Sequence, residues 1–136
     1  MTALGLIERL RQAVDDHDLD ALAACFAADF RNETPAHPGR GFSGREKVRA
    51  NWARIFGGVP DIAARVVRAT ADGDVVWTEW EMGGTRVDGV AQTLAGVIIF
   101  GVSGEHLSWC RFYLEPVDTG GETVEAAIGR IAEPVR

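Results

Sequence analysis

The chain has 136 residues, of which 46% are hydrophobic and 25% are charged. This length and composition are typical of one globular domain that buries a core without disulfides or metals. The formal net charge of −6 argues against nucleic acid and anionic membranes as partners, because both are negatively charged themselves. The longest apolar run, residues 94–102, is too short to cross a bilayer.

Cysteine usage and the N-terminus indicate the cellular compartment. Cys25 and Cys110 are far apart in sequence and form no C-x-x-C motif, and residues 1–10 lack a basic secretion signal. We therefore expect two structural thiols in a cytoplasmic protein. We also expect no metal and no cofactor, since His and Cys lack zinc spacing and no phosphate-binding glycine motif opens a helix.

The first third of the chain predicts two helices, a strand and a loop. Residues 3–16 carry apolar side chains at helical spacing. Asp18 is suited to cap a second short helix. Residues 29–34 then indicate a short strand, and residues 35–42, with two prolines and two glycines, indicate an irregular loop.

A third helix is predicted from a capping motif. Ser43 and Glu46 form the S-x-x-E pattern, in which the two residues satisfy each other's free backbone amides. Apolar residues follow at helical spacing, and Gly57 and Gly58 are expected to end the helix.

The second half of the chain predicts strands. Residues 62–71, 74–83 and 90–102 alternate or are continuously apolar, and a further strand ends before Pro116. An amphipathic helix can follow from Glu122. Helices followed by hairpin-connected strands indicate an α+β fold, a curved antiparallel sheet with helices on one face that can enclose an apolar cavity. We treat residues 1–136 as a single domain.

Several segments carry a family resemblance: FAADF, GFSGREKVRANW, ADGDVVWTEW, GVIIFGVSGEHLSW and RFYLEP, in this order over about residues 5–116. The chain resembles the SnoaL-like branch of the nuclear transport factor 2-like superfamily, leaving 117–136 as a C-terminal extension. The resemblance implies a bent sheet wrapped as a cone around three N-terminal helices, often dimeric through the outer face of the sheet. Relatives include polyketide cyclases, ketosteroid isomerases, limonene epoxide hydrolases, dehydratases and non-catalytic binding domains, so the fold alone leaves the activity open.

Alternation assigns the two faces of the strands, because successive side chains point to opposite sides of a sheet. In LSWCRFYLEP, residues 107–116, the reading at every second position groups Leu107 with Trp109. The more apolar set is expected to face the interior; across the two strands it comprises Val76, Thr78, Trp80, Met82, Cys110, Phe112 and Leu114.

The acids and bases of the related enzymes are missing at the matching positions. Where the resemblance implies the catalytic aspartate of the epoxide hydrolases, this chain has Phe112, and their arginine and second aspartate are matched by Trp80 and Met82. The basic aspartate of the steroid isomerases is matched by Thr34. The mechanisms of both kinds of enzyme therefore lose their proton-transfer groups here.

A largely apolar lining takes their place, and we predict it to bind substrate. The candidates are Asn32, Thr34, Phe42, Trp52, Phe56, Trp80, Met82, Cys110 and Phe112. Aromatic and Met side chains at such spacings can equally form a plain core. Asn32 and Thr34 can present polar groups to a ligand or satisfy backbone groups at the strand end. We interpret Cys110 as a core thiol.

His37, between Pro35 and Pro38 in the loop, is the candidate catalytic residue. An unperturbed imidazole titrates near neutral pH and can both take and give a proton. The alternative is a loop histidine without a role. His17 is expected to be exposed to solvent.

The outer face of the sheet is unusually aromatic. It carries Trp77, Glu79, Glu81, Trp109, Arg111 and Tyr113. If the two strands are near neighbours, Glu79 or Glu81 can pair with Arg111. Trp, Tyr and Arg are enriched in interface cores, so we predict a two-fold homodimer, with cover by the C-terminal segment as the alternative.

Two functional hypotheses follow. In the first, the protein is a cofactor-free isomerase, cyclase or dehydratase acting on a small polyketide- or steroid-like substrate, with His37 as proton shuttle and Asn32 or Thr34 orienting a carbonyl. In the second, it is a non-catalytic module for ligand binding or dimerisation. The missing acids favour the second hypothesis.

Overall fold

The computed structural model describes residues 1–135 and has the predicted α+β class. The chain folds in the order α1 (Ala3–Asp15), α2 (Leu19–Ala24), β1 (Phe26–Glu33), a 3-10 turn (Pro38–Arg40), β2 (Phe42–Ser43), α3 (Arg45–Gly58), β3 (Ala63–Asp72), β4 (Val75–Thr85), β5 (Ala91–Ser103), β6 (His106–Pro116) and α4 (Val124–Ala132). Asp18 caps α2 as predicted, its side chain accepting a hydrogen bond from the amide of Ala21.

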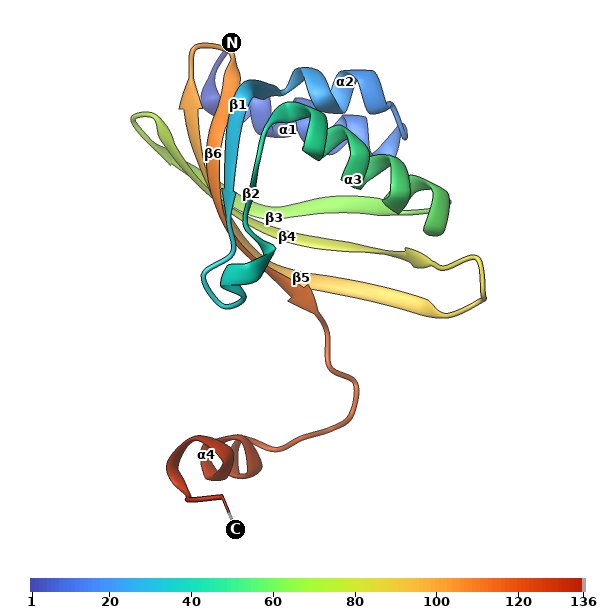
Figure 1. Ribbon diagram of the computed structural model, residues 1–136, viewed down its shortest axis with the longest axis vertical. Coiled ribbons are helices and arrows are strands. Elements are labelled where there is room, and N and C mark those ends of the chain that lie inside the picture. Colours follow the sequence, from blue (N-terminus) through green and yellow to red (C-terminus); the bar gives the residue numbers. More distant parts are fainter. Residues whose placement is uncertain (136) are drawn as a thin grey trace.

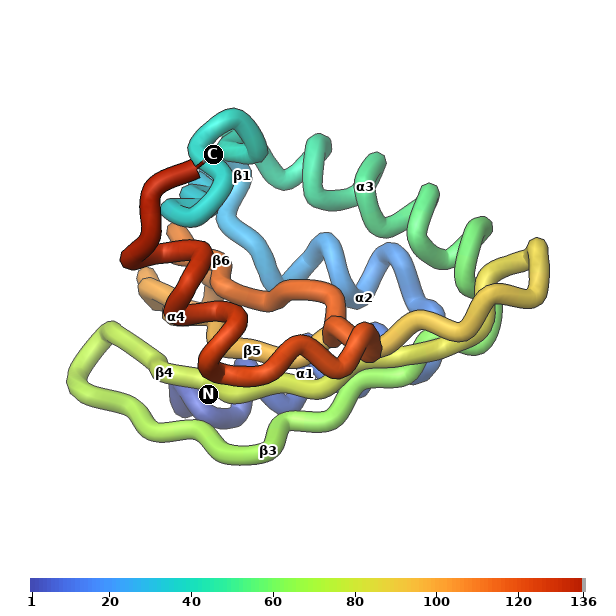
Figure 2. The backbone as a smooth tube through the Cα atoms, turned by 90° about the horizontal axis from the view of Figure 1, so that it is seen from below, coloured from blue at the N-terminus to red at the C-terminus, as the bar shows by residue number. Residues whose placement is uncertain are grey.

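The strands form one bent sheet in the order β2-β1-β6-β5-β4-β3. Its neighbouring strands are antiparallel except for β1 and β6, which run parallel, a pairing that the expected antiparallel sheet did not include. The long strands β3, β4 and β5 curve beneath the N-terminal helices (Figure 1). Seen from below, α3 and β3 lie on opposite sides of the molecule, with α2 between them (Figure 2). The turn between β4 and β5 meets the end of α3, where the amide of Val87 donates to the Gly58 carbonyl at 3.1 Å.

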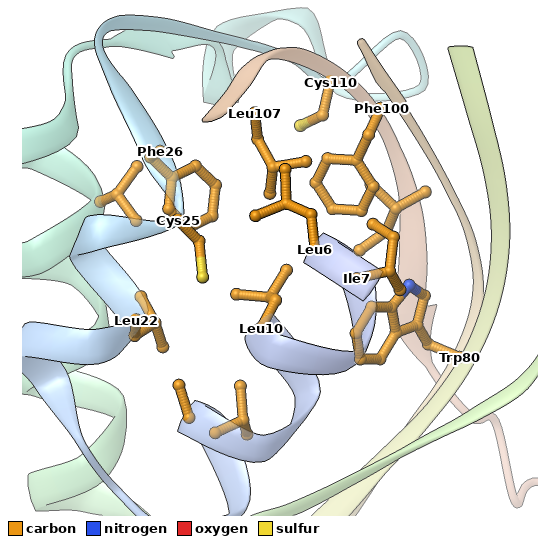
Figure 3. Close-up of a cluster of buried hydrophobic side chains, with 14 of the residues drawn as sticks. Leu6, Ile7, Leu10, Leu22, Cys25, Phe26, Trp80, Phe100, Leu107 and Cys110 are labelled. Atoms are coloured by element: carbon orange, nitrogen blue, oxygen red, sulfur yellow. The ribbon is translucent and has the colours of Figure 1, made fainter. Parts of the chain in front are cut away.

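The core forms between α1 and the concave face of the sheet. Leu6, Ile7 and Leu10 of α1 are buried; Figure 3 shows Ile7 beside Trp80 of the sheet and Leu10 on the side of α1 that faces Leu22 of α2. All of these side chains belong to one buried cluster. Of the apolar residues at helical spacing, Ile7, Leu10 and Val14 are buried, whereas Leu4 near the start of the helix is 45% exposed.

The predicted faces of β4 and β6 are confirmed. Val76, Thr78, Trp80 and Met82 are buried along β4, while Trp77 is 50% exposed on the opposite face. On β6, Cys110 and Leu114 are buried and Phe112 packs against the core.

One residue of β6 departs from strict alternation. Leu107 is fully buried, although the period-two reading groups it with Trp109 on the outer face. The pairing of β5 with β6 shifts in register between Gly101 and Val102. Such a bulge adds one residue and reverses the sense of alternation on either side of it.

The start of α3 also differs from the prediction. Ser43 belongs to β2, paired with Arg31, and makes no capping hydrogen bond; the N-cap residue is Gly44, at φ +99°. The amide of Gly44 donates to the Phe30 carbonyl at 2.6 Å. Because the chain turns directly from a paired strand into the helix, it needs a left-handed residue there, and glycine meets that need.

The C-terminal segment stands away from the sheet. The helix predicted from Glu122 begins at Val124, and Figure 1 shows α4 below the body of the molecule at the end of an extended connection. None of the residues Val124–Ala132 is buried, and Ile128 and Ile131 are exposed. Among residues 1–135, no helix is both long enough and apolar enough to cross a membrane.

Candidate functional site

A cavity of about 350 Å³ lies between the concave face of the sheet and α3. Its size is at the small end of the range for ligand pockets, about 300–1,000 Å³. Its walls are mostly aliphatic and aromatic, and they comprise Leu10, Val14, Phe26, Phe30, Asn32, Thr34, Arg40, Phe42, Val48, Asn51, Trp52, Ile55, Val59, Ile62, Trp80, Met82, Gln92, Leu94, Ile98, Phe100, Cys110, Phe112 and Leu114.

Most of the residues predicted to bind substrate lie together on this wall. Asn32, Thr34, Phe42, Trp52, Trp80, Met82, Cys110 and Phe112 line the cavity, although whether they bind a substrate stays a prediction. Phe56 is not on the wall: its ring stacks on His17 at 4.8 Å between centroids. His17, expected in solvent, is half-buried, because Nε2 lies 2.9 Å from the Ile62 carbonyl oxygen.

A chain of three buried polar groups crosses the apolar wall between β1 and β6. The Cys110 thiol donates to Asn32 Oδ1 at 3.0 Å, and Asn32 Nδ2 donates to Thr34 Oγ1 at 3.0 Å. The first hydrogen bond orients the Asn32 side chain, because a thiol donor requires the amide oxygen to face it. The amide nitrogen then faces Thr34. Since Thr34 Oγ1 accepts from Asn32, its own proton is available to an oxygen atom of a molecule in the cavity.

Burial keeps the Cys110 thiol protonated. Loss of solvent, followed by the negative charge of Glu33, raises its pKa to about 12. A thiol in this state is a weak hydrogen-bond donor and not a nucleophile, since the thiolate is the reactive form. This agrees with the interpretation of Cys110 as a core residue.

Trp80 is held rigidly at the base of the cavity. Its indole nitrogen donates to Thr78 Oγ1 at 2.7 Å, and that hydroxyl donates to the Ile98 carbonyl at 2.5 Å. The tryptophan is fully buried. A buried indole with its N–H satisfied offers its apolar ring to whatever occupies the cavity.

His37 lies beside the cavity but not on its wall. Its Nε2 is 3.1 Å from Glu115 Oε1, and Arg40 Nη1 is 3.6 Å from Glu115 Oε2. Glu115 Oε1 is shielded from solvent and, within residues 1–135, has no hydrogen-bond donor in favourable geometry. These contacts place the side chains of the loop before β2 next to the end of β6.

The ion pairs on the outer face differ from the prediction. Glu79 pairs with Arg68 and Glu81 pairs with Arg65, both across the β3–β4 hairpin. Arg111 pairs instead with Glu33 of β1 at 2.9 Å. The reason is the strand order, which places β5 between β4 and β6 and keeps the predicted partners two strands apart.

Sequence reasoning missed several polar residues of the site. Arg40, Asn51 and Gln92 line the cavity, and Glu115 anchors its rim. Asn51 lies next to Trp52 on α3, but a single polar residue in a helix gives no pattern to detect. The described residues contain no cluster of three His, Cys, Asp or Glu side chains suited to hold a metal.

Comparison with solved structures places the fold among known ones. An epoxide hydrolase from M. tuberculosis has a TM-score of 0.72 at 20% identity, covering 83% of this chain and 82% of that one. A SnoaL-like polyketide cyclase from Shewanella denitrificans has a TM-score of 0.69 at 14% identity, covering 82% and 89%. A protein with a ketosteroid isomerase-like fold from Catenulispora acidiphila, bound to trimethylamine, scores 0.68 at 22% identity, covering 82% and 87%.

Sequence comparisons give the family. No curated protein matches the chain. The model of the SnoaL-like domain, by contrast, matches residues 7–109, which run from within α1 to the first residues of β6. The protein therefore belongs to the SnoaL-like domain family.

Proposed function

We propose that the protein binds a small hydrophobic molecule bearing a hydrogen-bonding oxygen. The supporting observation is the cavity wall, where one hydrogen-bonded polar chain interrupts an otherwise apolar and aromatic surface. Apolar walls favour binding by burial of apolar area, and a few fixed polar groups set the orientation of the ligand. In this arrangement the Thr34 hydroxyl donates to the oxygen of the ligand.

A matched pair of probes tests the role of Thr34. We expect 2-acetylnaphthalene, a ketone, to bind more tightly than 2-ethylnaphthalene, which has a similar shape without the oxygen. Thr34→Val removes the donor at nearly constant volume and is expected to abolish a preference of about 2- to 10-fold. Affinities follow from titration calorimetry, and Thr34→Ser is the matched control that keeps the hydroxyl.

The outcomes separate clearly. Equal affinity of the wild-type protein for ketone and hydrocarbon contradicts the role of Thr34, and absence of binding to both contradicts the proposed function. Circular dichroism of each variant checks that the fold is intact.

The chemistry of the wall favours binding without catalysis. Among the lining residues, all within the described chain, none carries a carboxylate or an imidazole, and the Cys110 thiol is protonated at neutral pH. A cofactor-free isomerase, cyclase or dehydratase needs a group that moves a proton at the ligand.

The alternative catalytic function depends on His37. Its position at the rim, with Nε2 3.1 Å from Glu115 Oε1, is the observation that favours this alternative, because a neighbouring carboxylate can orient an imidazole for proton transfer. Once a turnover is found, His37→Ala is expected to abolish it if the histidine carries the proton. An unchanged kcat in this variant, with His106→Ala as the exposed control, removes His37 from the mechanism.

A further inference from the structure

Charge is distributed very unevenly around the cavity. Arg40 is the one charged side chain among its lining residues, all of which lie within residues 1–135. Its side chain is 58% exposed, whereas Asn32 and Thr34 on the same wall are buried. The arginine therefore lies at the rim, where the cavity meets solvent.

The backbone around Arg40 is held in place by its own hydrogen bonds. The amide of His37 donates to the Thr34 carbonyl at 2.9 Å, and the amide of Arg40 donates to the His37 carbonyl at 2.9 Å. Pro38 begins this 3-10 turn with a fixed φ. The loop thus offers its arginine from a defined position next to Asn32 and Thr34, with little conformational freedom left to lose on binding.

Most of the hydrogen-bonding capacity of the Arg40 side chain is still available. Its ion pair with Glu115 joins Nη1 to Oε2 at 3.6 Å, which is longer than a hydrogen bond and involves one edge of the guanidinium. Glu115 has a second cationic partner in His37 whenever that imidazole is protonated. A guanidinium has five N–H donors in a planar fork that matches the two oxygens of a carboxylate.

We propose that the ligand of this cavity is a small apolar carboxylic acid whose carboxylate binds Arg40 at the rim. The apolar body of the ligand then lies against Phe112 and Trp80. A single arginine suits a monoanion, whereas phosphate groups usually meet several cations or a row of backbone amides. This inference rests on the proposed binding function and adds the charge of the ligand to it.

The experiment compares 2-naphthylacetic acid with 2-(2-naphthyl)ethanol, a neutral alcohol of similar shape. Both are titrated by calorimetry into the full chain at pH 8, where the acid is ionised. We expect the acid to bind about tenfold more tightly, and Arg40→Gln to remove that preference while the affinity for the alcohol stays unchanged. Arg31→Gln removes the same charge from an exposed position on β1 and is expected to keep the preference.

Each result has one reading. If the alcohol binds and the acid binds no better, the carboxylate proposal is overturned while the proposed function stands. If neither compound binds the wild-type protein, both fail. A preference for the acid that survives in Arg40→Gln, or that is lost in Arg31→Gln, also overturns the assignment to Arg40.

Discussion

Cys25 and Cys110 show how burial dominates the chemistry of a side chain. Burial raises the pKa of the Cys25 thiol to about 11, partly offset by the positive charge of Arg9, and raises that of Cys110 to about 12. Both thiols are free and buried. In the folded protein they therefore stay protonated over the whole physiological range.

We predict that neither thiol reacts with Ellman's reagent at pH 8 in the folded protein, and that both react in guanidinium chloride. The reason is that the reagent cannot reach the buried sulfur atoms and that both thiols stay protonated, whereas the reagent reacts with the thiolate. Rapid modification of one thiol without denaturant would show that its pKa is not raised in this way. In guanidinium chloride, the Cys110→Ser variant is expected to release the colour of one thiol, that of Cys25, and the difference from the wild type gives the reaction of Cys110.

The same shifts have a consequence for stability at high pH. The pKa of each thiol is higher in the folded state than its unperturbed value of 9.0, so the unfolded state releases protons first as the pH rises. The contribution of the protonated thiols to the free energy of unfolding is fully present below pH 9 and is lost as the pH rises toward 11 and 12. We expect the urea midpoint to fall less over this interval in Cys25→Ala/Cys110→Ala than in the wild type.

At this scale the sequence predicts strand residues better than loop residues. Alternation assigns Trp80, Met82 and Phe112 to the interior because a strand has a fixed period. Arg40 and His37 belong to a loop without a period, so only the folded chain shows that one lines the cavity and the other faces Glu115.

Among the elements, the contact between β5 and β6 depends on two glycines that face side chains or backbone at close range. A Cβ atom at Gly101 would overlap the indole ring of Trp109, and one at Gly96, at φ +151°, would overlap the carbonyl of Tyr113. Both lie on β5, where the sheet bends around the helices. The absence of side chains there lets the two strands curve together.

We predict that Gly101→Ala lowers the free energy of unfolding by about 1–3 kcal/mol, as is typical when a packed site is overfilled. Urea denaturation measures the change. Trp109→Ala removes the ring that the new methyl group meets, so the double variant is expected to lose less than the sum of the two single variants. Strictly additive losses would contradict the contact as the cause.

The elements also show which local signals are reliable. The Asp18 cap was predicted correctly because it depends on residues within one helical turn. The Ser43 capping box was wrong because β2 pairs with β1 and takes the serine into the sheet. The bulge between Leu107 and Trp109 depends on pairing with β5, which a single strand does not reveal.

At the scale of the whole molecule, the outer face of the sheet has an apolar centre with a charged border. Trp77 pairs in register with Ile99, and Val97 pairs with Tyr113, which is 37% exposed. Ion pairs such as Arg68–Glu79 border this outer patch. The C-terminal helix, with no buried residue over Val124–Ala132, does not cover it. We propose that a second copy of the chain does, because a two-fold axis brings identical patches together.

Light scattering after size exclusion tests this proposal. We predict a dimer mass for the wild-type protein and a monomer mass for Trp77→Asp, because the charge is placed in the centre of the patch. Ile128→Asp, on α4, is the matched control and is expected to remain dimeric. A monomer mass for the wild type at micromolar concentration contradicts the proposal, and dissociation by Ile128→Asp alone moves the interface to α4.

Because α4 is separate from the sheet, its backbone amides and those of the sheet are protected from hydrogen exchange to different degrees. A helix of nine residues is shorter than the roughly 12–15 residues that an isolated helix needs for stability in water. Its backbone amides therefore exchange with solvent deuterons much sooner than those of β4 and β5, which require disruption of the sheet. A tag or fusion partner attached after α4 leaves the slowly exchanging region untouched.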